Sequence, residues 1–301
     1  MKRNDLKKMA IVGFLSVLLI AGTMTAANGH GHHHHKPQKK GILLVAFGSS
    51  LPEAQAAFDH IDKTVRSAFP DIAVRWAYTS RIIRDKLEKQ GEKLNSPAQA
   101  LAEMADAGFT AVAVQSLHTI AGAEYHDLVR VAERFEQMPE GIDHVRIGLP
   151  MLGGPADMEK VAQAILATIP EKRAADEAVV LLGHGTHHPA NAVYAALMWR
   201  LQLADENVFV GTVEGFPKAD VIIDQVKENG VEKAWLMPFM SVAGDHAQND
   251  MAGSGKDSWR SVLENAGIEC ETVMKGTAEY DAFVDIWVGH LKSALSALKA
   301  E

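Results

Sequence analysis

The run Val179-Val180-Leu181-Leu182-Gly183-His184-Gly185 has the pattern of a strand that ends in a turn. Four aliphatic residues in a row are typical of a parallel strand that is buried on both faces. Ligands of open α/β sheets bind at the carboxyl ends of the strands, so His184 is placed where chemistry is expected. The two glycines let the backbone turn sharply and leave the imidazole uncovered. Taken alone, the run is better explained as a strand-to-helix turn with an incidental histidine. Whether His184 is functional therefore depends on partner residues elsewhere in the chain.

The rest of the chain repeats this alternation of short apolar runs and longer amphipathic segments. The expected strands are 41–47, 72–78, 110–117, 144–149, 178–182, 208–213, 233–240 and 268–273. The expected helices are 52–68, 80–90, 97–107, 123–138, 155–169, 189–203, 218–229, 246–266 and 280–299. Strands that alternate with helices of this length predict βαβ units and parallel sheets. The chain of 301 residues is therefore expected to form two α/β domains, 41–170 and 171–301.

The two halves match each other in the same element order, which indicates an internal duplication with a cleft between two similar domains. Leu43 to Gly48 aligns with Val180 to Gly185, and Ala121 to Glu124 aligns with Ala243 to His246. Three aligned positions differ in chemistry: Phe47 against His184, Ser80 against Glu214, and Glu124 against His246.

Three residues capable of binding metal thus follow three successive strands of the second half. If the strands are as expected, His184, Glu214 and His246 lie at one edge of one sheet. Two imidazoles and a carboxylate suit a divalent ion such as iron, cobalt, nickel or zinc. Three ligands at strand ends predict an open site that leaves positions for water or substrate. Each residue alone is equally well explained as a polar strand end, but the three in register are not.

The sequence resembles the anaerobic-type sirohydrochlorin cobalt chelatases, which are relatives of ferrochelatase among the class II chelatases. The resemblance runs from about Lys40 to Lys299 and rests on Leu43–Ser50, Gln115–His118, Gly183–Gly185 and, most strongly, Leu236–Met251. It implies two Rossmann-like domains with parallel sheets. It further implies that His184, His246 and Glu214 handle the metal ion and the pyrrole protons.

This resemblance predicts an enzyme that inserts Co²⁺ into a free tetrapyrrole such as sirohydrochlorin, with Fe²⁺ or Ni²⁺ as alternative ions. A neutral histidine can accept a proton or release a metal ion near neutral pH, which suits metal handover. Thiolates would hold the ion too tightly for transfer. We expect one of the three residues to accept the pyrrole protons.

Five further residues are weaker candidates. Glu124, His118, Ser49 and Ser80 could line the tetrapyrrole cleft. Glu124 is equally well explained as a carboxylate at a helix start, and His118 is better explained as a buried, hydrogen-bonded histidine. His126 could be an axial ligand for a haem at a subunit contact, although a surface histidine is the usual explanation. A haem held at such a contact would make the protein a homo-oligomer, and this alternative stays open.

Three residues close to His246 in the sequence are candidate supports for its ring. Asp245, Asn249 and Asp250 could orient His246 or cap its helix, and capping is the simpler explanation.

The first 40 residues do not read as part of the fold. Residues 1–27 have a basic start, an apolar run and small residues before Asn28, which is the pattern of a cleaved secretory signal peptide. We expect a periplasmic or otherwise exported protein that leaves the membrane after cleavage. The histidine-rich segment 28–40 is a native metal-gathering tail, a purification tag or a passive linker.

Charge and cysteine content narrow the function further. The net charge of −8 argues against a nucleic-acid partner, and one cysteine, Cys270, excludes an intrachain disulfide.

The predicted export also keeps a second function class open, that of an exported carrier for haem, another tetrapyrrole or metal in the same cleft. A third class is a metal buffer in which the histidine-rich segment dominates.

Overall fold

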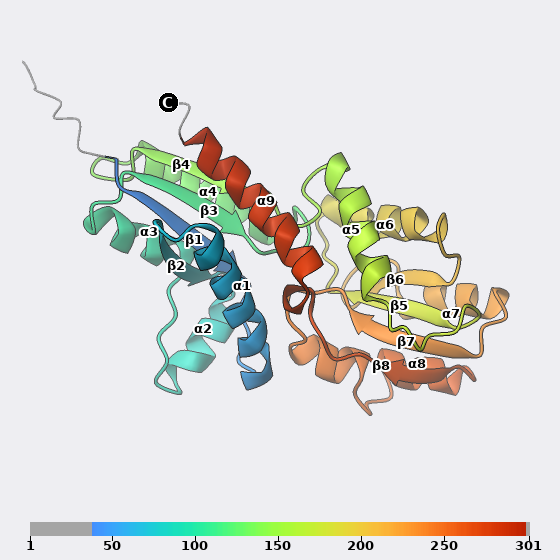
Figure 1. Ribbon diagram of the computed structural model, residues 1–301. Coiled ribbons are helices and arrows are strands. Elements are labelled where there is room, and N and C mark those ends of the chain that lie inside the picture. The colour runs from blue at the N-terminus through green and yellow to red at the C-terminus, as the bar shows by residue number, and fades with distance from the viewer. Residues whose placement is uncertain (1–37, 299–301) are drawn as a thin grey trace, which may run out of the picture. The chain divides into compact units, whose positions relative to one another are not determined.

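The computed structural model describes residues 38–298 (Figure 1). The predicted signal peptide and nearly all of the histidine-rich segment lie outside the described residues. Among residues 38–298, none of the helices combines the length and the apolar character that a membrane crossing needs.

Residues 38–298 form two four-stranded sheets, and every strand pair in them is parallel. The first sheet contains β1 (Lys40–Ala46), β2 (Ala73–Tyr78), β3 (Ala111–Ser116) and β4 (His144–Gly148). The second contains β5 (Ala178–Gly183), β6 (Val208–Thr212), β7 (Lys233–Pro238) and β8 (Glu269–Thr272). The strand orders are β2-β1-β3-β4 and β6-β5-β7-β8, so both halves share one topology, as the duplication predicts.

Helices connect the parallel strands in both halves. The first half has α1 (Gln55–Ala68), α2 (Arg81–Glu88), α3 (Pro97–Asp106), α4 (Ala123–Gln137) and α5 (Pro155–Thr168). The second half has α6 (Ala192–Gln202), α7 (Ala219–Glu228), α8 (Trp259–Asn265) and α9 (Asp281–Ala297). Short helical turns precede α1, α6 and α9: η1 (Pro52–Ala54), η2 (Pro189–Asn191) and η4 (Thr277–Glu279).

The central strand of the first sheet is buried on both faces, which explains its unbroken apolar sequence. Ile42 and Leu44 of β1 pack in the cluster that contains α1 residues such as Phe58. Leu43 and Val45 pack on the opposite face, in the cluster formed with α3 and α4. Alternate residues of one strand therefore belong to different layers of the core.

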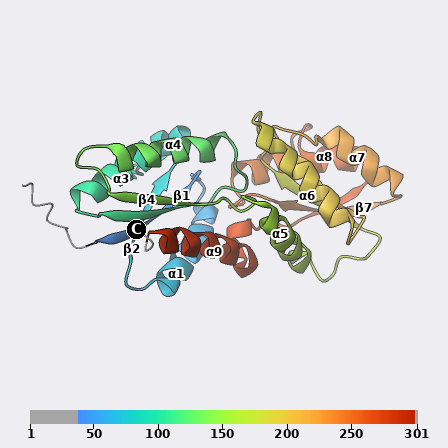
Figure 2. The same ribbon diagram turned by 90° about the horizontal axis from the view of Figure 1, so that it is seen from above.

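The last helix of the chain packs on the first sheet and not on the second. Trp287 of α9 is buried, and its Nε1 donates to the carbonyl of His118, which follows β3 (3.4 Å). Conversely, Glu159 of α5 accepts from Arg200 of α6 (2.8 Å). Figures 1 and 2 show α9 beside β3 and β4, and α5 beside α6. The division at 170/171 stays a prediction about the duplication, because these helices cross it.

One expected element is wrong. The segment 246–266 was expected to be a single helix, but it contains a π-helical turn, η3 (Ala247–Met251), a loop, and then α8 from Trp259. The chain leaves the helical path at Gly253-Ser254-Gly255, and Ser258 then caps α8 by accepting from the Ser261 amide (3.1 Å).

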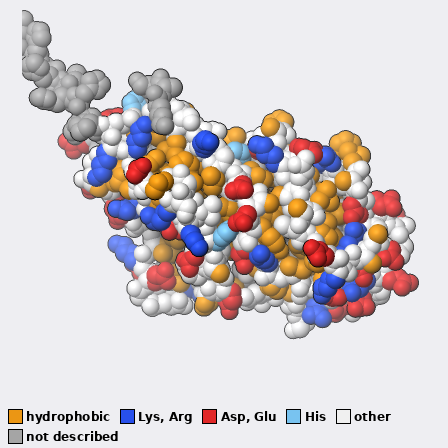
Figure 3. All heavy atoms as spheres, viewed as in Figure 1, with side chains coloured by type: hydrophobic (Ala, Val, Ile, Leu, Met, Phe, Trp, Pro, Cys, Tyr) orange, Lys and Arg blue, Asp and Glu red, His pale blue; other side chains and the backbone are white. Residues whose placement is uncertain are grey.

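Acidic and basic side chains are interspersed on the face of the molecule seen in Figure 3, which carries no uniformly basic surface.

Candidate metal-transfer site

His184 directly follows the central strand of the second sheet, and its flanking glycines are sterically required. A Cβ atom on Gly183 would lie 2.4 Å from the ring of Tyr194. Gly185 has a φ of +80°, and a Cβ there would lie 2.5 Å from the Gly215 nitrogen. Tyr194 is buried, and this burial raises the pKa of its phenol to about 12. The histidine is therefore presented by a tightly packed turn.

His246 lies in the segment that follows β7, a neighbour of β5 in the same sheet. The chain leaves β7 at Pro238, and His246 immediately precedes the turn η3. Its Nδ1 lies 2.6 Å from Oδ2 of Asp250, one turn further on. The Asp250 carboxylate accepts this hydrogen bond, so Nδ1 carries the proton.

The two imidazoles meet edge to face. Their ring centroids are 4.6 Å apart and their planes are nearly perpendicular, at 88°. Nδ1 of His184 lies 2.9 Å from the carbonyl oxygen of Gly185, which can only accept, so this Nδ1 also carries the proton. Among the described residues, neither Nε2 has a hydrogen-bond partner. Both histidines thus hold a free nitrogen lone pair, as metal ligation requires.

Glu214 lies beside this pair through its backbone. Its amide donates to the carbonyl of His184 (2.8 Å), which extends the pairing of β5 with β6. Its side chain is exposed. Among the described residues, no three His, Cys, Asp or Glu side chains are arranged to hold a metal ion. The structure therefore brings the two histidines together and leaves the Glu214 carboxylate in solvent nearby.

Residues of the first half approach the histidine pair. The ring centroid of Phe47, at the end of β1, lies 6.3 Å from that of His184, and Phe47 is 39% exposed. Ser49 Oγ lies 3.5 Å from the position that a Cβ of Gly244 would occupy. The pair is therefore placed where strand ends of both halves meet, with an aromatic ring on the first-half side.

The hydroxyls of the two candidate serines already have structural roles. Ser49 Oγ accepts from the Leu51 amide (3.2 Å) within its own turn. Ser80 is buried, and its Oγ accepts from the Ile83 amide (3.3 Å), which caps α2. The Ser80 amide also donates to the carbonyl of Phe47 (3.1 Å), which fixes the start of α2 beside the site.

His118 lies at the end of β3 in a network of hydroxyl groups. Its Nδ1 lies 2.8 Å from Ser116 Oγ, and its Nε2 lies 3.4 Å from Thr79 Oγ1. Burial lowers the pKa of His118 to about 4, so the ring is neutral at physiological pH. The His118 residue is half-buried, and both of its ring nitrogens lie near hydroxyl groups.

The remaining candidates lie on the surface of α4. Glu124 and His126 are both exposed. The ring of His126 lies 5.1 Å from that of His188, which follows the His184 turn, so α4 also contacts the second half.

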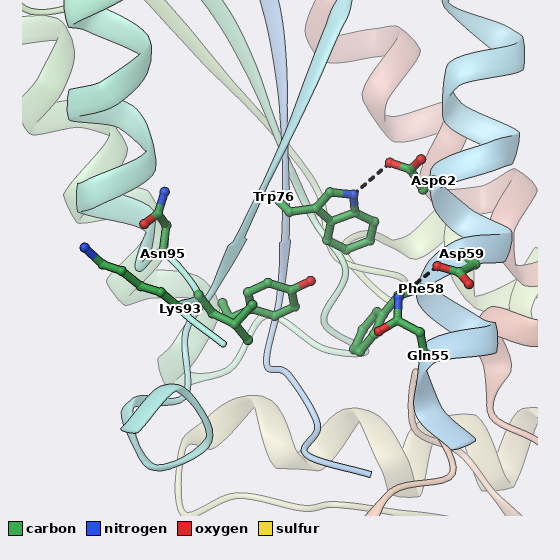
Figure 4. Close-up of a pocket in the computed structure, with 9 residues that line it drawn as sticks. Gln55, Phe58, Asp59, Asp62, Trp76, Lys93 and Asn95 are labelled. Atoms are coloured by element: carbon green, nitrogen blue, oxygen red, sulfur yellow. Dashed lines mark hydrogen bonds between the residues drawn. The ribbon is translucent and has the colours of Figure 1, made fainter. Parts of the chain in front are cut away.

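Two hollows lie apart from the histidine pair. One, of about 380 Å³, is lined by Trp76 and Tyr78 of β2, by α1, and by Lys93–Asn95 (Figure 4). The other, of about 700 Å³, is a largely apolar groove between α5 and α9. None of the predicted metal ligands lines either hollow.

Sequence reasoning did not find the residues that support the turn around His184. Tyr194 fills the space beside Gly183, and Asn191 accepts from the Thr186 amide (3.0 Å). Neither contact has a sequence signal, because both depend on how α6 packs against the end of β5. The flanking glycines were the available clue, since each marks a close approach of other atoms.

Two solved structures share the fold of this chain. SirB from Bacillus subtilis, determined with Fe³⁺, aligns with a TM-score of 0.58 and 14% identity, covering 88% of this chain and 98% of its own. CbiX, described as the terminal enzyme for the biosynthesis of siroheme in denitrifying bacteria, aligns with a TM-score of 0.53 and 16% identity, covering 84% and 99%. The fold is thus that of the class II chelatases.

Sequence comparison gives the family. Residues 40–296 match the cobalt chelatase (CbiK) family. Sirohydrochlorin cobaltochelatase CbiKC of Nitratidesulfovibrio vulgaris is 46% identical over 88% of this chain and 94% of its own length. Sirohydrochlorin cobaltochelatase of Salmonella typhimurium is 35% identical over 86% and 97%. The chain belongs to the cobalt chelatase family, as the resemblance predicts.

Proposed function

We propose that this protein inserts Co²⁺ into sirohydrochlorin as a step of cobalamin biosynthesis. The observation that carries the proposal is the facing pair of His184 and His246, each with its Nδ1 proton engaged and its Nε2 free. Membership of the cobalt chelatase family supports metal insertion as the reaction. The two relatives are sirohydrochlorin cobaltochelatases, which supports Co²⁺ and sirohydrochlorin as the substrates.

In the proposed reaction, two pyrrole protons leave the macrocycle as one Co²⁺ ion enters, so charge is conserved. His184 and His246 present the ion through Nε2, and neutral imidazoles release it readily. The Glu214 side chain is exposed, and its backbone amide donates to the carbonyl of His184. Its carboxylate rotates toward the ion or takes up a released proton.

The test is the rate of Co²⁺ insertion, followed by the visible absorbance of the tetrapyrrole. His184→Ala and His246→Ala are each expected to lower this rate by about 10²–10⁴-fold, the range for losing a positioned acid–base group. Glu214→Gln is expected to lower it less. His187→Ala, on the exposed part of the same loop, serves as the control and keeps the parental rate. Parental rates in both alanine variants would refute the assignment.

The identity of the ion is a separate part of the proposal. Imidazole and carboxylate ligands also accept Fe²⁺ and Ni²⁺, so we propose that both ions compete with Co²⁺. Insertion assays with each ion under anaerobic conditions measure this competition, and failure of either ion to slow Co²⁺ insertion would contradict it.

Haem binding is proposed at a different place. We propose that the exposed His126 is an axial ligand for haem at a contact between copies of the chain. His126→Ala would then remove the Soret band of haem-loaded protein and leave Co²⁺ insertion unchanged. A Soret band that persists would exclude His126.

Export is proposed from residues 1–27 alone, whose sequence has the layout of a cleaved signal peptide. The mass of the protein isolated from the periplasm tests this, with cleavage expected near Asn28.

An exported tetrapyrrole carrier would use the same cleft without turnover, and among the described residues no feature favours it over an enzyme.

A further inference from the structure

The contact between His246 and Asp250 assigns a role to a residue outside the metal ligands. We propose that Asp250 is a positioning residue for metal capture: its carboxylate holds the His246 ring with Nε2 directed at the incoming ion. This proposal rests on the proposed function, since it presupposes that His246 binds the ion.

The hydrogen bond is short and its donor is defined. Asp250 Oδ2 lies 2.6 Å from Nδ1 of His246, within the range of charge-assisted hydrogen bonds. The His246 side chain is 34% exposed and the Asp250 side chain is 44% exposed. Both side chains are therefore partly exposed, and the hydrogen bond to Asp250 restricts rotation of the His246 ring about its side-chain bonds.

The carboxylate is held by a rigid piece of backbone. The turn η3 closes with a hydrogen bond from the Ala252 amide to the Ala247 carbonyl (3.1 Å), five residues apart. Ala247 and Met251 are fully buried and anchor the turn in the core. A Cβ on Gly253 would lie 2.3 Å from the carbonyl oxygen of Asn249, so only glycine closes this turn undistorted. Single π-helical turns of this kind often occur at functional sites.

The two metal-binding histidines differ in what holds them. Nδ1 of His184 donates to a neutral carbonyl, whereas Nδ1 of His246 donates to a carboxylate. A carboxylate partner orients a metal-binding histidine and strengthens it as a ligand. Among the described residues, no other carboxylate contacts either ring by hydrogen bond or ion pair. We therefore expect His246 to be the ligand whose geometry sets Co²⁺ affinity.

The same turn offers a matched control. Asp245 accepts a hydrogen bond from Asn249 (2.9 Å) at the same spacing of four residues, and this pair is exposed. Asp245 is the sequence neighbour of His246, yet among the described residues its carboxylate forms no hydrogen bond or ion pair with the imidazole. Asp245→Asn removes the same charge from the same turn without touching the proposed anchor.

The experiment measures Co²⁺ binding to the full chain in the absence of any tetrapyrrole. Dissociation constants come from titration, and the visible d–d absorption of Co²⁺ reports the ligand geometry. The double variant His184→Ala/His246→Ala gives the Co²⁺ bound elsewhere, including at the histidine-rich segment, and its titration is subtracted from the others.

Asp250→Asn is expected to weaken Co²⁺ binding about 10–100-fold and to shift the d–d spectrum, as loss of an outer-shell partner does. Asp250→Glu, which keeps the carboxylate, is expected to recover most of the affinity. Asp245→Asn stays within about twofold of the parent. In insertion assays, the KM for Co²⁺ rises in Asp250→Asn while the KM for the tetrapyrrole does not change.

Parental affinity and spectrum in Asp250→Asn would overturn the proposal, as would an equal loss in Asp245→Asn. The variant His246→Ala distinguishes a wrong metal site from a wrong role of Asp250. If His246→Ala itself binds Co²⁺ as the parent does, the proposed metal site is wrong. If His246→Ala loses the ion and Asp250→Asn does not, only the positioning role fails.

Discussion

At the scale of single residues, the Gly183-His184-Gly185 turn shows how a histidine is fixed before any ligand arrives. Gly183 packs against the Tyr194 ring, and Gly185 packs against Gly215 in a left-handed conformation. The His184 Nδ1 proton is engaged by the Gly185 carbonyl. The backbone itself therefore sets the direction of the free Nε2.

Gly183→Ala tests this steric requirement. The added methyl group would lie 2.4 Å from Tyr194, and we expect a loss of about 1–3 kcal/mol in the free energy of unfolding, together with weaker Co²⁺ binding. Gly289→Ala in α9 meets no atom within 4 Å and is expected to gain up to about 1 kcal/mol from helix propensity. Urea denaturation measures both, and equal stability in the two variants would contradict the account.

The lowered pKa of His118 predicts that the protein loses stability at acidic pH. Its pKa is lowered by burial to about 4 in the folded protein, so the unfolded chain binds more protons between about pH 4 and 6.5. Stability is therefore lost as the pH falls through this window, by at most about 3 kcal/mol from this group. His118→Gln should lose less stability than the parent between pH 7 and pH 5 in urea denaturation. An identical loss in both proteins would show that His118 is not responsible.

At the scale of elements, the apolar runs predicted the inner strands β1, β3, β5 and β7 well because these strands are buried on both faces. The prediction of a single helix over 246–266 was wrong because the backbone departs from the helix around Gly253 and Gly255. The position of His184 and His246 could be predicted, since both follow strands of one sheet. The Asp250 contact could only be weighed against capping, because a π-helical turn has no reliable sequence signature.

The contact between α5 and α9 predicts that two acidic residues of α5 contribute very differently to the stability of the fold. Both ring nitrogens of His290 in α9 face oxygen atoms at 3.0 Å, the Leu149 carbonyl and the Asp157 carboxylate. Asp157 and His290 are almost fully buried, so Asp157→Ala leaves a buried polar group without its partner and should cost about 3 kcal/mol.

The control variant comes from the same helix. Glu159 of α5 pairs with Arg200 at the surface, and Glu159→Ala should leave the unfolding midpoint close to that of the parent. Thermal or urea unfolding compares the two variants. Similar losses in both would show that the α5–α9 contact is not a special support of the fold.

At the scale of the whole molecule, the duplication predicted two sheets with the same strand order, and this is confirmed. The sequence did not predict that α9 leaves the second half to cover β3 and β4 of the first. Helix periodicity shows that a helix has an apolar face, but not which sheet that face meets. The meeting of the two halves places Phe47 opposite His184, so the candidate site belongs to the intact chain.

Multiple-turnover insertion of Co²⁺ into sirohydrochlorin shows whether this site catalyses metal insertion. The parent chain should convert many equivalents of tetrapyrrole per chain, while the His184→Ala/His246→Ala variant should stay at the uncatalysed rate. Conversion that stops at one equivalent per chain, or undiminished turnover by the double variant, would contradict catalysis at this site.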